Sequence, residues 1–251
     1  MRLDNYIVQI GLFETRTKAQ QAISRGEIFV NNKVVTKNSY QIDEENPSNI
    51  EYVYTEKYVS LGGYKLKKAL NDFNFNVENL VVADIGASTG GFTDCLLKNG
   101  VKKVYSIDLN DDLLHFSLKN NDRVVRVIKN AKNLKTEDFS DVLDLIVADL
   151  SFISLKDVIN IFSNLLSTGK KLIVLIKPQF ETGQKIKFKN GIIKDKKIQI
   201  QICKNIFNIA IENSLCPLSF TSAPIVDGKN LEFLMLFEKN GKVGMNINEI
   251  K

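Results

Sequence analysis

The sequence predicts a mainly parallel, doubly wound α/β sheet that follows a small α+β unit. From about residue 60 onward, short apolar runs alternate with amphipathic segments, as strands and helices do around a parallel sheet. The first forty-odd residues differ, because two short helical repeats precede a strand, a tight turn and a second strand. The chain has 251 residues, of which 44% are hydrophobic, which suffices for one large core or two smaller ones.

Composition argues against several classes of protein. The net charge of +5, from 34 basic and 29 acidic residues, permits a nucleic-acid partner without requiring one. Three cysteines without a C-x-x-C spacing and a single histidine argue against a disulfide scaffold and against a metal site. No apolar run approaches the roughly 20 residues of a membrane span, and the N-terminus lacks the apolar core of a signal peptide. We therefore expect a soluble, cytoplasmic protein without a membrane partner.

The N-terminal unit is predicted to contain two helices and a small sheet. Apolar residues recur at helical spacing over 3–10, and Gly11 stands where that helix should end. A second helix is expected from Thr15 to Gly26, and the unit should end at residue 57. The remaining elements are strands at 27–30, 33–35 and 50–54, a tight turn at 31–32 and an exposed loop at 43–49.

The second unit, 58–251, is predicted to alternate strands with helices. Its strands are apolar runs bounded by polar or glycine-rich turns, and its helices are amphipathic. Strands are expected at 80–84, 103–108, 124–128, 143–149, 171–176 and 232–238, and helices at 65–73, 92–98, 155–166 and 198–214.

The turn after the first of these strands is the most informative stretch. It reads VVADIGASTGGF over 81–92, so an apolar strand runs directly into three glycines and then into a helix. Glycines here let the backbone turn sharply and approach a ligand without a Cβ clash. Asp108 ends the next strand, 22 residues after Gly86, where an acid can accept hydrogen bonds from ribose hydroxyls. We expect a cofactor that carries a ribose; the alternative is a tight strand–helix turn without a ligand.

The spacing of this turn indicates the class of cofactor. D-x-G-x-x-x-G-G is neither the dinucleotide fingerprint G-x-G-x-x-G nor the phosphate loop G-x-x-x-x-G-K-[ST]. Asp84, just before the turn, suits a ligand with a positive end better than a pyrophosphate. S-adenosylmethionine has an amine and a sulfonium, and we expect it as the cofactor.

Charged residues stand at the ends of other predicted strands. Asp149 ends one apolar strand, and Lys177 follows the next. Lys65 lies on the helix that enters the unit, and Glu232 begins the last strand. We expect these two lysines and two carboxylates to meet around one cleft.

Such a group suits transfer to a sugar hydroxyl. A ribose 2′-hydroxyl is a poor nucleophile because it keeps its proton far above neutral pH. A lysine amine can take that proton if its pKa is lowered, which burial and a second cation both do, and carboxylates can hold the amines in place. Ordinary alternatives stay open, since Asp149 could only cap the following helix and Lys177 could be solvated. Lys65 and Glu232 could equally lie on solvated faces.

Residues 2–36 resemble the RNA-binding domain first named for ribosomal protein S-four. Four later stretches resemble the TlyA family, whose members are called both haemolysins and ribosomal RNA 2′-O-methyltransferases. The resemblance covers nearly the whole chain, and three of its motifs occur in the family's order. The four stretches are YVSLGGYKL (58–66), DIGASTGGFTDCLL (84–97), VADLSFISL (147–155) and IKPQFE (176–181).

The resemblance implies an FtsJ-like domain that uses S-adenosylmethionine and has the Rossmann-like class I methyltransferase fold, with an antiparallel last strand. The family's Lys-Asp-Lys-Glu tetrad carries over to Lys65, Asp149, Lys177 and Glu232. It implies that Lys177 is the general base, that Lys65 keeps this amine uncharged or holds the hydroxyl, and that the two acids orient the lysines. The cofactor contacts that carry over are Asp84, Gly86, Ala87, Ser88, Thr89, Gly90, Gly91, Phe92 and Asp108, with Asn130 and Ala131 near the adenine.

The resemblance also implies a substrate, because family members modify cytidine riboses in ribosomal RNA. The short ends of the chain favour the small-subunit (16S) RNA, recognised within the ribosomal subunit, by a protein that we expect to be monomeric. Leu61 departs from the family's usual Y-V-S-R-G-G, which puts in doubt an RNA or interdomain contact of that arginine. The competing functions are a pore-forming haemolysin and a ribosome-binding assembly factor without catalysis.

Basic residues in two places are expected to contact RNA phosphates. The segment 185–197 carries six lysines against a single acid, and we expect a mobile loop that engages RNA at the mouth of the cleft. Both places could instead be ordinary solvated surface. The candidates are Arg2, Arg16, Lys18 and Arg25 in the N-terminal unit, and Lys185, Lys187 and Lys189 in the loop.

Overall fold

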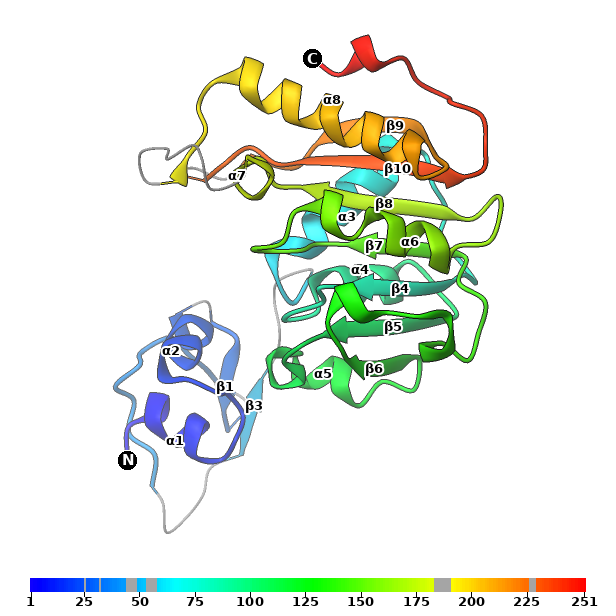
Figure 1. Ribbon diagram of the computed structural model, residues 1–251. Coiled ribbons are helices and arrows are strands. Elements are labelled where there is room, and N and C mark those ends of the chain that lie inside the picture. Colours follow the sequence, from blue (N-terminus) through cyan, green and yellow to red (C-terminus); the bar gives the residue numbers. More distant parts are fainter. Residues whose placement is uncertain (25, 32, 44–48, 53–57, 183–190, 226–228) are drawn as a thin grey trace. The chain divides into compact units, whose positions relative to one another are not determined.

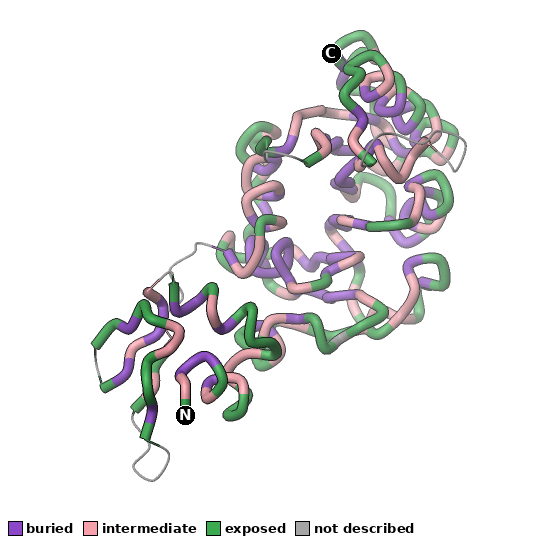
Figure 2. The backbone as a smooth tube through the Cα atoms, turned by 90° about the vertical axis from the view of Figure 1, so that its left-hand side faces the viewer, coloured by how far each residue is buried: buried purple, intermediate pink, exposed green. Residues whose placement is uncertain are grey.

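The computed structural model describes residues 1–24, 26–31, 33–43, 49–52, 58–182, 191–225 and 229–251 (Figure 1). The chain divides into two compact units, Met1–Lys57 and Tyr58–Lys251. Each unit has buried stretches of its own, which are coloured purple in Figure 2.

The first unit packs two helices against a three-stranded antiparallel sheet. Strand β1 lies between β2 and β3. Leu3 and Ile7 are four residues apart, so both lie on the buried side of the first helix. The elements are α1 (Leu3–Gln9), α2 (Arg16–Ser24), β1 (Ile28–Val30), β2 (Lys33–Val35) and β3 (Ile50–Tyr52).

The second unit contains a seven-stranded sheet in the order β6-β5-β4-β7-β8-β10-β9 (Figure 1). Strands β4 to β8 are parallel to one another, whereas β10 is antiparallel to both β8 and β9. The mostly parallel sheet with an antiparallel last strand is thereby confirmed. The strands are β4 (Val81–Ile85), β5 (Lys103–Asp108), β6 (Val124–Ile128), β7 (Leu145–Ala148), β8 (Lys171–Ile176), β9 (Leu215–Ser222) and β10 (Phe233–Lys239).

Helices cover both faces of this sheet. Val82 packs on the face covered by α3, α4 and α5, and Ala83 packs on the face covered by α6 and α8, because successive strand residues point to opposite sides. The helices are α3 (Leu61–Asp72), α4 (Gly91–Lys98), α5 (Phe116–Lys119), α6 (Ile159–Leu165), α7 (Pro178–Glu181) and α8 (Lys196–Glu212). Short 3₁₀ helices are η1 (Asp111–Leu113), η2 (Ala131–Asn133), η3 (Thr136–Asp138), η4 (Leu155–Asp157) and η6 (Ile247–Glu249).

Several elements differ from the prediction, since α3 begins at Leu61 and neither α5 nor α7 was expected. The helix expected over 155–166 is broken at Val158, which separates η4 from α6. Strand β9, which contains Pro217, is not among the strands that the sequence pattern predicts. Proline cannot donate a ladder hydrogen bond, but β9 is an edge strand, where proline is tolerated, and its register with β10 shifts beside Pro217.

The winding of the sheet reverses between β4 and β7. The chain continues from β4 to β5 on one side and from β7 to β8 on the other. Open α/β sheets bind ligands at the carboxyl ends of strands beside such a point. Since β10 is antiparallel to β8, its amino end lies at the same edge.

Candidate active site

The glycine turn after β4 has a shape that larger residues would disrupt. Gly86 and Gly90 have φ angles of +85° and +89°, which favour glycine. A Cβ on Gly86 would lie 2.5 Å from the carbonyl oxygen of Asp149, and a Cβ on Gly91 would lie 2.2 Å from Ser60 Oγ. The glycines therefore let the β7 end and the start of α3 approach the turn closely.

Asp108 holds the same turn from the end of β5. Its Oδ2 accepts a hydrogen bond of 2.9 Å from Ser88 N, and its Oδ1 accepts one of 3.1 Å from Asn110 N. Each carboxylate oxygen has further lone pairs. Asp108 thus stands where the sequence places it, at the end of the strand next to β4, with capacity for a ligand hydroxyl.

Asp84 is fully buried beneath the turn. Its Oδ2 accepts a hydrogen bond of 2.6 Å from Thr93 Oγ1, while its Oδ1 has no hydrogen-bond partner among the described residues. Burial raises the pKa of the Asp84 carboxyl to about 7, against the hydrogen bond from Thr93, and the charge of Asp149 raises it further. A buried acceptor without a partner is costly unless a ligand supplies a donor.

A cavity of about 150 Å³ opens between the glycine turn and the end of β7. Its walls combine backbone of the turn with a carboxylate and an amine. They are formed by Ser60, Gly62, Gly86, Ala87, Ser88, Thr89, Gly91, Phe92, Asp149, Ser151 and Lys177.

Lys177 and Asp149 form an ion pair at this cavity. Lys177 Nζ lies 2.5 Å from Asp149 Oδ1 and donates a hydrogen bond of 2.9 Å to Ser151 Oγ. The lysine side chain is only 11% exposed, so the amine is held rather than solvated. The side chains that follow β7 and β8 therefore meet at the cavity.

Lys65 and Glu232 form a second ion pair. Lys65 Nζ lies 2.6 Å from Glu232 Oε2, and both side chains are mostly buried. Glu232 directly precedes Phe233, which pairs with Ile176, the residue before Lys177. The two pairs thus sit at the ends of adjacent strands, although Lys65 and Glu232 do not line the cavity.

The two residues expected near the adenine stand farther along the edge. Asn130 follows β6, and its side chain accepts a hydrogen bond of 2.9 Å from Lys132 N, which caps η2. Ala131 is buried in the core. The backbone of Lys129 bonds to the carbonyl of Asp108, which brings this segment beside β5, but neither Asn130 nor Ala131 lines the cavity.

Sequence reasoning did not single out Ser60, Gly62, Ser151 or Phe152. Ser151 follows Asp149 by two residues, and its hydroxyl accepts from Lys177. Phe152 is 87% exposed and has a φ of +65°, an unusual conformation for an aromatic residue. All four residues lie within the motifs quoted above, but no spacing in the sequence predicts that Ser60, Gly62 and Ser151 line the cavity or that the Phe152 ring is exposed.

Three further contacts join the loop after β7 to α7. The rings of Phe152 and Phe180 have centroids 5.0 Å apart. Glu181 accepts hydrogen bonds of 2.5 Å from Ser154 Oγ and 2.9 Å from Leu155 N. Burial raises the pKa of the Glu181 carboxyl. The segments that follow Asp149 and Lys177 are thus tied together beyond the ion pair.

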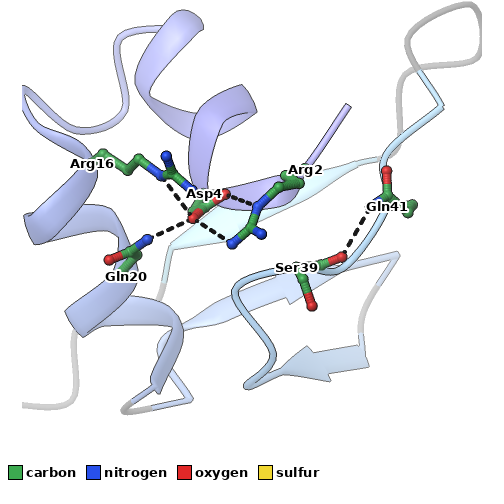
Figure 3. A network of polar contacts seen from close by, with 6 residues as sticks. All are labelled: Arg2, Asp4, Arg16, Gln20, Ser39 and Gln41. Atoms are coloured by element: carbon green, nitrogen blue, oxygen red, sulfur yellow. Dashed lines mark hydrogen bonds and ion pairs between the residues drawn. The ribbon is translucent and has the colours of Figure 1, made fainter.

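The expected RNA contacts divide into three groups. Arg2 and Arg16 converge on buried Asp4 (Figure 3). Lys18 pairs with Glu14 on the surface. The others, Arg25, Lys185, Lys187 and Lys189, lie outside the described residues.

Among the described helices, none is both long and apolar enough to cross a bilayer.

Comparison with known proteins gives two domain matches. The profile of the FtsJ-like methyltransferase family matches residues 58–239, and that of the S4 domain matches residues 1–46. The crystal structure of a Lactococcus lactis protein named as a hemolysin superposes with a TM-score of 0.73 and 35% identity, over 77% of this chain and 96% of that one.

Curated relatives extend the match over most of the chain. "Hemolysin A" of Brachyspira hyodysenteriae is 42% identical, over 94% of this chain and 99% of its own. "16S/23S rRNA (cytidine-2'-O)-methyltransferase TlyA" of Mycobacterium tuberculosis is 33% identical, over 79% and 74%. "23S rRNA (cytidine-2'-O)-methyltransferase TlyA" of Campylobacter jejuni is 31% identical, over 96% and 100%. The chain therefore belongs to the TlyA family, in which an S4 domain precedes an FtsJ-like methyltransferase domain.

Proposed function

We propose that this protein transfers a methyl group from S-adenosylmethionine to the 2′-hydroxyl of a cytidine in ribosomal RNA. The observation that carries the proposal is the ion pair of Lys177 and Asp149 in the wall of the cavity beside the glycine turn. It places a held, largely buried amine next to a pocket at the switch point of the sheet. The names of the relatives supply the substrate class, cytidine ribose.

The residues of the turn fit S-adenosylmethionine, which supplies an electrophilic methyl group when bound. Asp84 does not line the cavity, but its Oδ1 lies buried beneath the turn without a partner among the described residues, which suits an ammonium group. The glycine backbone leaves room for the amino-acid end. Asp108 is placed for the ribose hydroxyls. The cavity, about 150 Å³, is smaller than the roughly 300 Å³ or more of a complete ligand pocket, so the nucleoside end would extend over its open rim toward Asp108.

Lys177 would first release to solvent the proton that it carries in the ion pair, and its uncharged amine would then accept the hydroxyl proton. Bound S-adenosylmethionine would supply the methyl group to the ribose oxygen and leave without it as the neutral thioether, and Lys177 Nζ would take the proton that this oxygen releases. Asp149 and Ser151 hold Nζ in place, so the base needs no rearrangement to accept the proton. At the neighbouring strand end, Glu232 holds Lys65, which does not line the cavity and would hold the hydroxyl only once RNA is bound.

We further propose the small-subunit 16S RNA as the substrate. The relatives carry names that include 16S and 23S together or 23S alone, so the choice needs an experiment. The purified chain would be incubated with labelled S-adenosylmethionine and with small subunits, large subunits or naked RNA. We expect label on small subunits, at one cytidine. Label on large subunits alone would overturn the choice of subunit, and absence of label on all three would overturn the function.

A further inference from the structure

The first unit contains a buried acid that no step of methyl transfer uses. Asp4 is 0% exposed and accepts four hydrogen bonds (Figure 3). Arg2 Nε and Nη2 donate to Oδ1 and Oδ2 at 3.0 Å each, as a fork. Arg16 Nε at 3.0 Å and Gln20 Nε2 at 2.7 Å donate to Oδ2. Both oxygens of a single carboxylate are therefore committed to holding other side chains.

The two arginines are held but not buried. Their side chains are 40% and 52% exposed, against 0% for Asp4. Arg2 uses two of its five N–H groups on Asp4 and Arg16 uses one, and no other partner of either guanidinium occurs among the described residues. The cluster keeps a net charge of +1, because two guanidiniums face one carboxylate. Hydrogen bonds from Arg2 hold the pKa of Asp4 well below its usual range, so that this charge persists at any ordinary pH.

This arrangement differs from a solvated basic surface. A free arginine loses side-chain entropy when it binds a phosphate, whereas a guanidinium already fixed by a carboxylate loses less. A planar fork with unused N–H groups also matches the two oxygens of a phosphate. By contrast, Lys18 pairs with Glu14 on the surface, with side chains 45% and 48% exposed, and neither is anchored by a buried group.

We propose that Asp4 is a positioning residue that aims Arg2 and Arg16 at phosphate groups of ribosomal RNA. This inference rests on the proposed function, because the proposed function supplies the ligand, ribosomal RNA. Asp4 would make no contact with RNA; it would act through the two guanidiniums.

The competing explanation is that Asp4 only ties α1 to α2, since Arg16 and Gln20 lie on the second helix. The two explanations differ in the sign of one effect. If position did not matter, removing a negative charge beside the arginines would strengthen RNA binding by simple electrostatics. If Asp4 positions the two guanidiniums, removing the Asp4 carboxylate weakens RNA binding although the protein becomes more positive.

The test measures binding of the full chain to isolated small subunits and to naked 16S RNA over a range of salt concentrations, without cofactor. We expect Asp4→Asn to weaken binding about tenfold, as the loss of one or two charge-assisted contacts would. Glu14→Gln is the matched control, because it removes an acid of the same unit that holds no arginine; its affinity should stay the same or rise slightly. Affinity for Asp4→Asn equal to or above wild type, in a folded protein, overturns the inference.

A second variant covers the case in which Asp4→Asn unfolds the unit. Arg16→Lys keeps the charge at a half-exposed position but loses the fork, so affinity should fall while the slope of log K against log salt stays unchanged. Arg16→Gln should instead reduce that slope by about 0.7 to 0.9, the value of one phosphate contact. Unchanged affinity for Arg16→Lys overturns the inference. These experiments measure RNA binding and not methyl transfer. A negative result therefore overturns the role of Asp4 without contradicting the proposed enzyme activity, which the methyl-transfer assay tests.

Discussion

Lys177 is the side chain on which the proposed chemistry depends most. Lys177→Met keeps the length of the side chain and removes the base, so methyl transfer should fall about 10²- to 10⁴-fold. Binding of S-adenosylmethionine, measured by calorimetry, should stay close to wild type. Lys170→Met is the matched control, because Lys170 forms a comparable ion pair with Asp144 at the opposite end of β8 and should be dispensable for transfer. Equal rates for the two variants would remove Lys177 from its role.

Asp84 makes the stability of the second unit depend on pH. Its pKa is raised from 3.8 to about 7, so between these values the folded state keeps a proton that the unfolded state has lost. Stability should therefore decrease as pH rises through this window, by at most about 4 kcal/mol. Asp84→Asn should remove this slope, as measured by urea unfolding at several pH values. Parallel pH profiles for the two proteins would contradict this assignment.

Phe152 presents an exposed ring on the loop that begins at Asp149. Bases stack on such rings in single-stranded RNA complexes, at about 1–3 kcal/mol each. Phe152→Ala should therefore raise KM for the RNA substrate about 5- to 150-fold, with little change in cofactor affinity. Phe116→Ala removes another partly exposed ring, on α5, and serves as control. A KM equal to wild type would exclude stacking on Phe152.

The sequence predicts that Asp149 and Lys177 lie at neighbouring strand ends, but it does not predict how the four charged residues pair. Asp149 and Lys177 end neighbouring strands, so their approach follows from the alternation of strands and helices. Lys65 pairs with Glu232, and Lys177 donates to Ser151. Both contacts depend on how the side chains pack, which residue spacing in the sequence does not predict.

At the scale of elements, Glu181 joins the loop after β7 to the helix after β8. Glu181→Ala should lower kcat about tenfold, because the ion pair loses its fixed geometry, and should lower Tm. Glu181→Gln keeps an acceptor for Leu155 N and a partner for Ser154, so it should restore most of kcat. A loss of Tm with unchanged kcat in Glu181→Ala would show that this tie serves stability alone.

Most elements of the sheet follow from local pattern. Strands β5, β6 and β8 were predicted to the residue, because each is an apolar run between clear turns. Strand β9 was missed, since Pro217 is read as a strand breaker and only its edge position in the sheet makes it acceptable. Edge position is a property of the assembled sheet, which local sequence does not specify.

At the scale of the whole molecule, the proposed site of methyl transfer and the proposed RNA-binding arginines belong to different units. The second unit brings the glycine turn, Asp149 and Lys177 to one edge of a sheet, while the first unit displays two arginines fixed by a buried acid. The net charge of +5 is modest, so affinity for RNA should depend on placed contacts more than on overall charge.

The most direct test of the central claim is the chemical identity of the product. Small-subunit RNA methylated by the full chain would be digested to nucleosides and analysed by mass spectrometry. We predict 2′-O-methylcytidine as the new nucleoside, present with wild type and absent with Lys177→Met. A methyl group on a base, or the same product with Lys177→Met at the wild-type rate, would contradict the account.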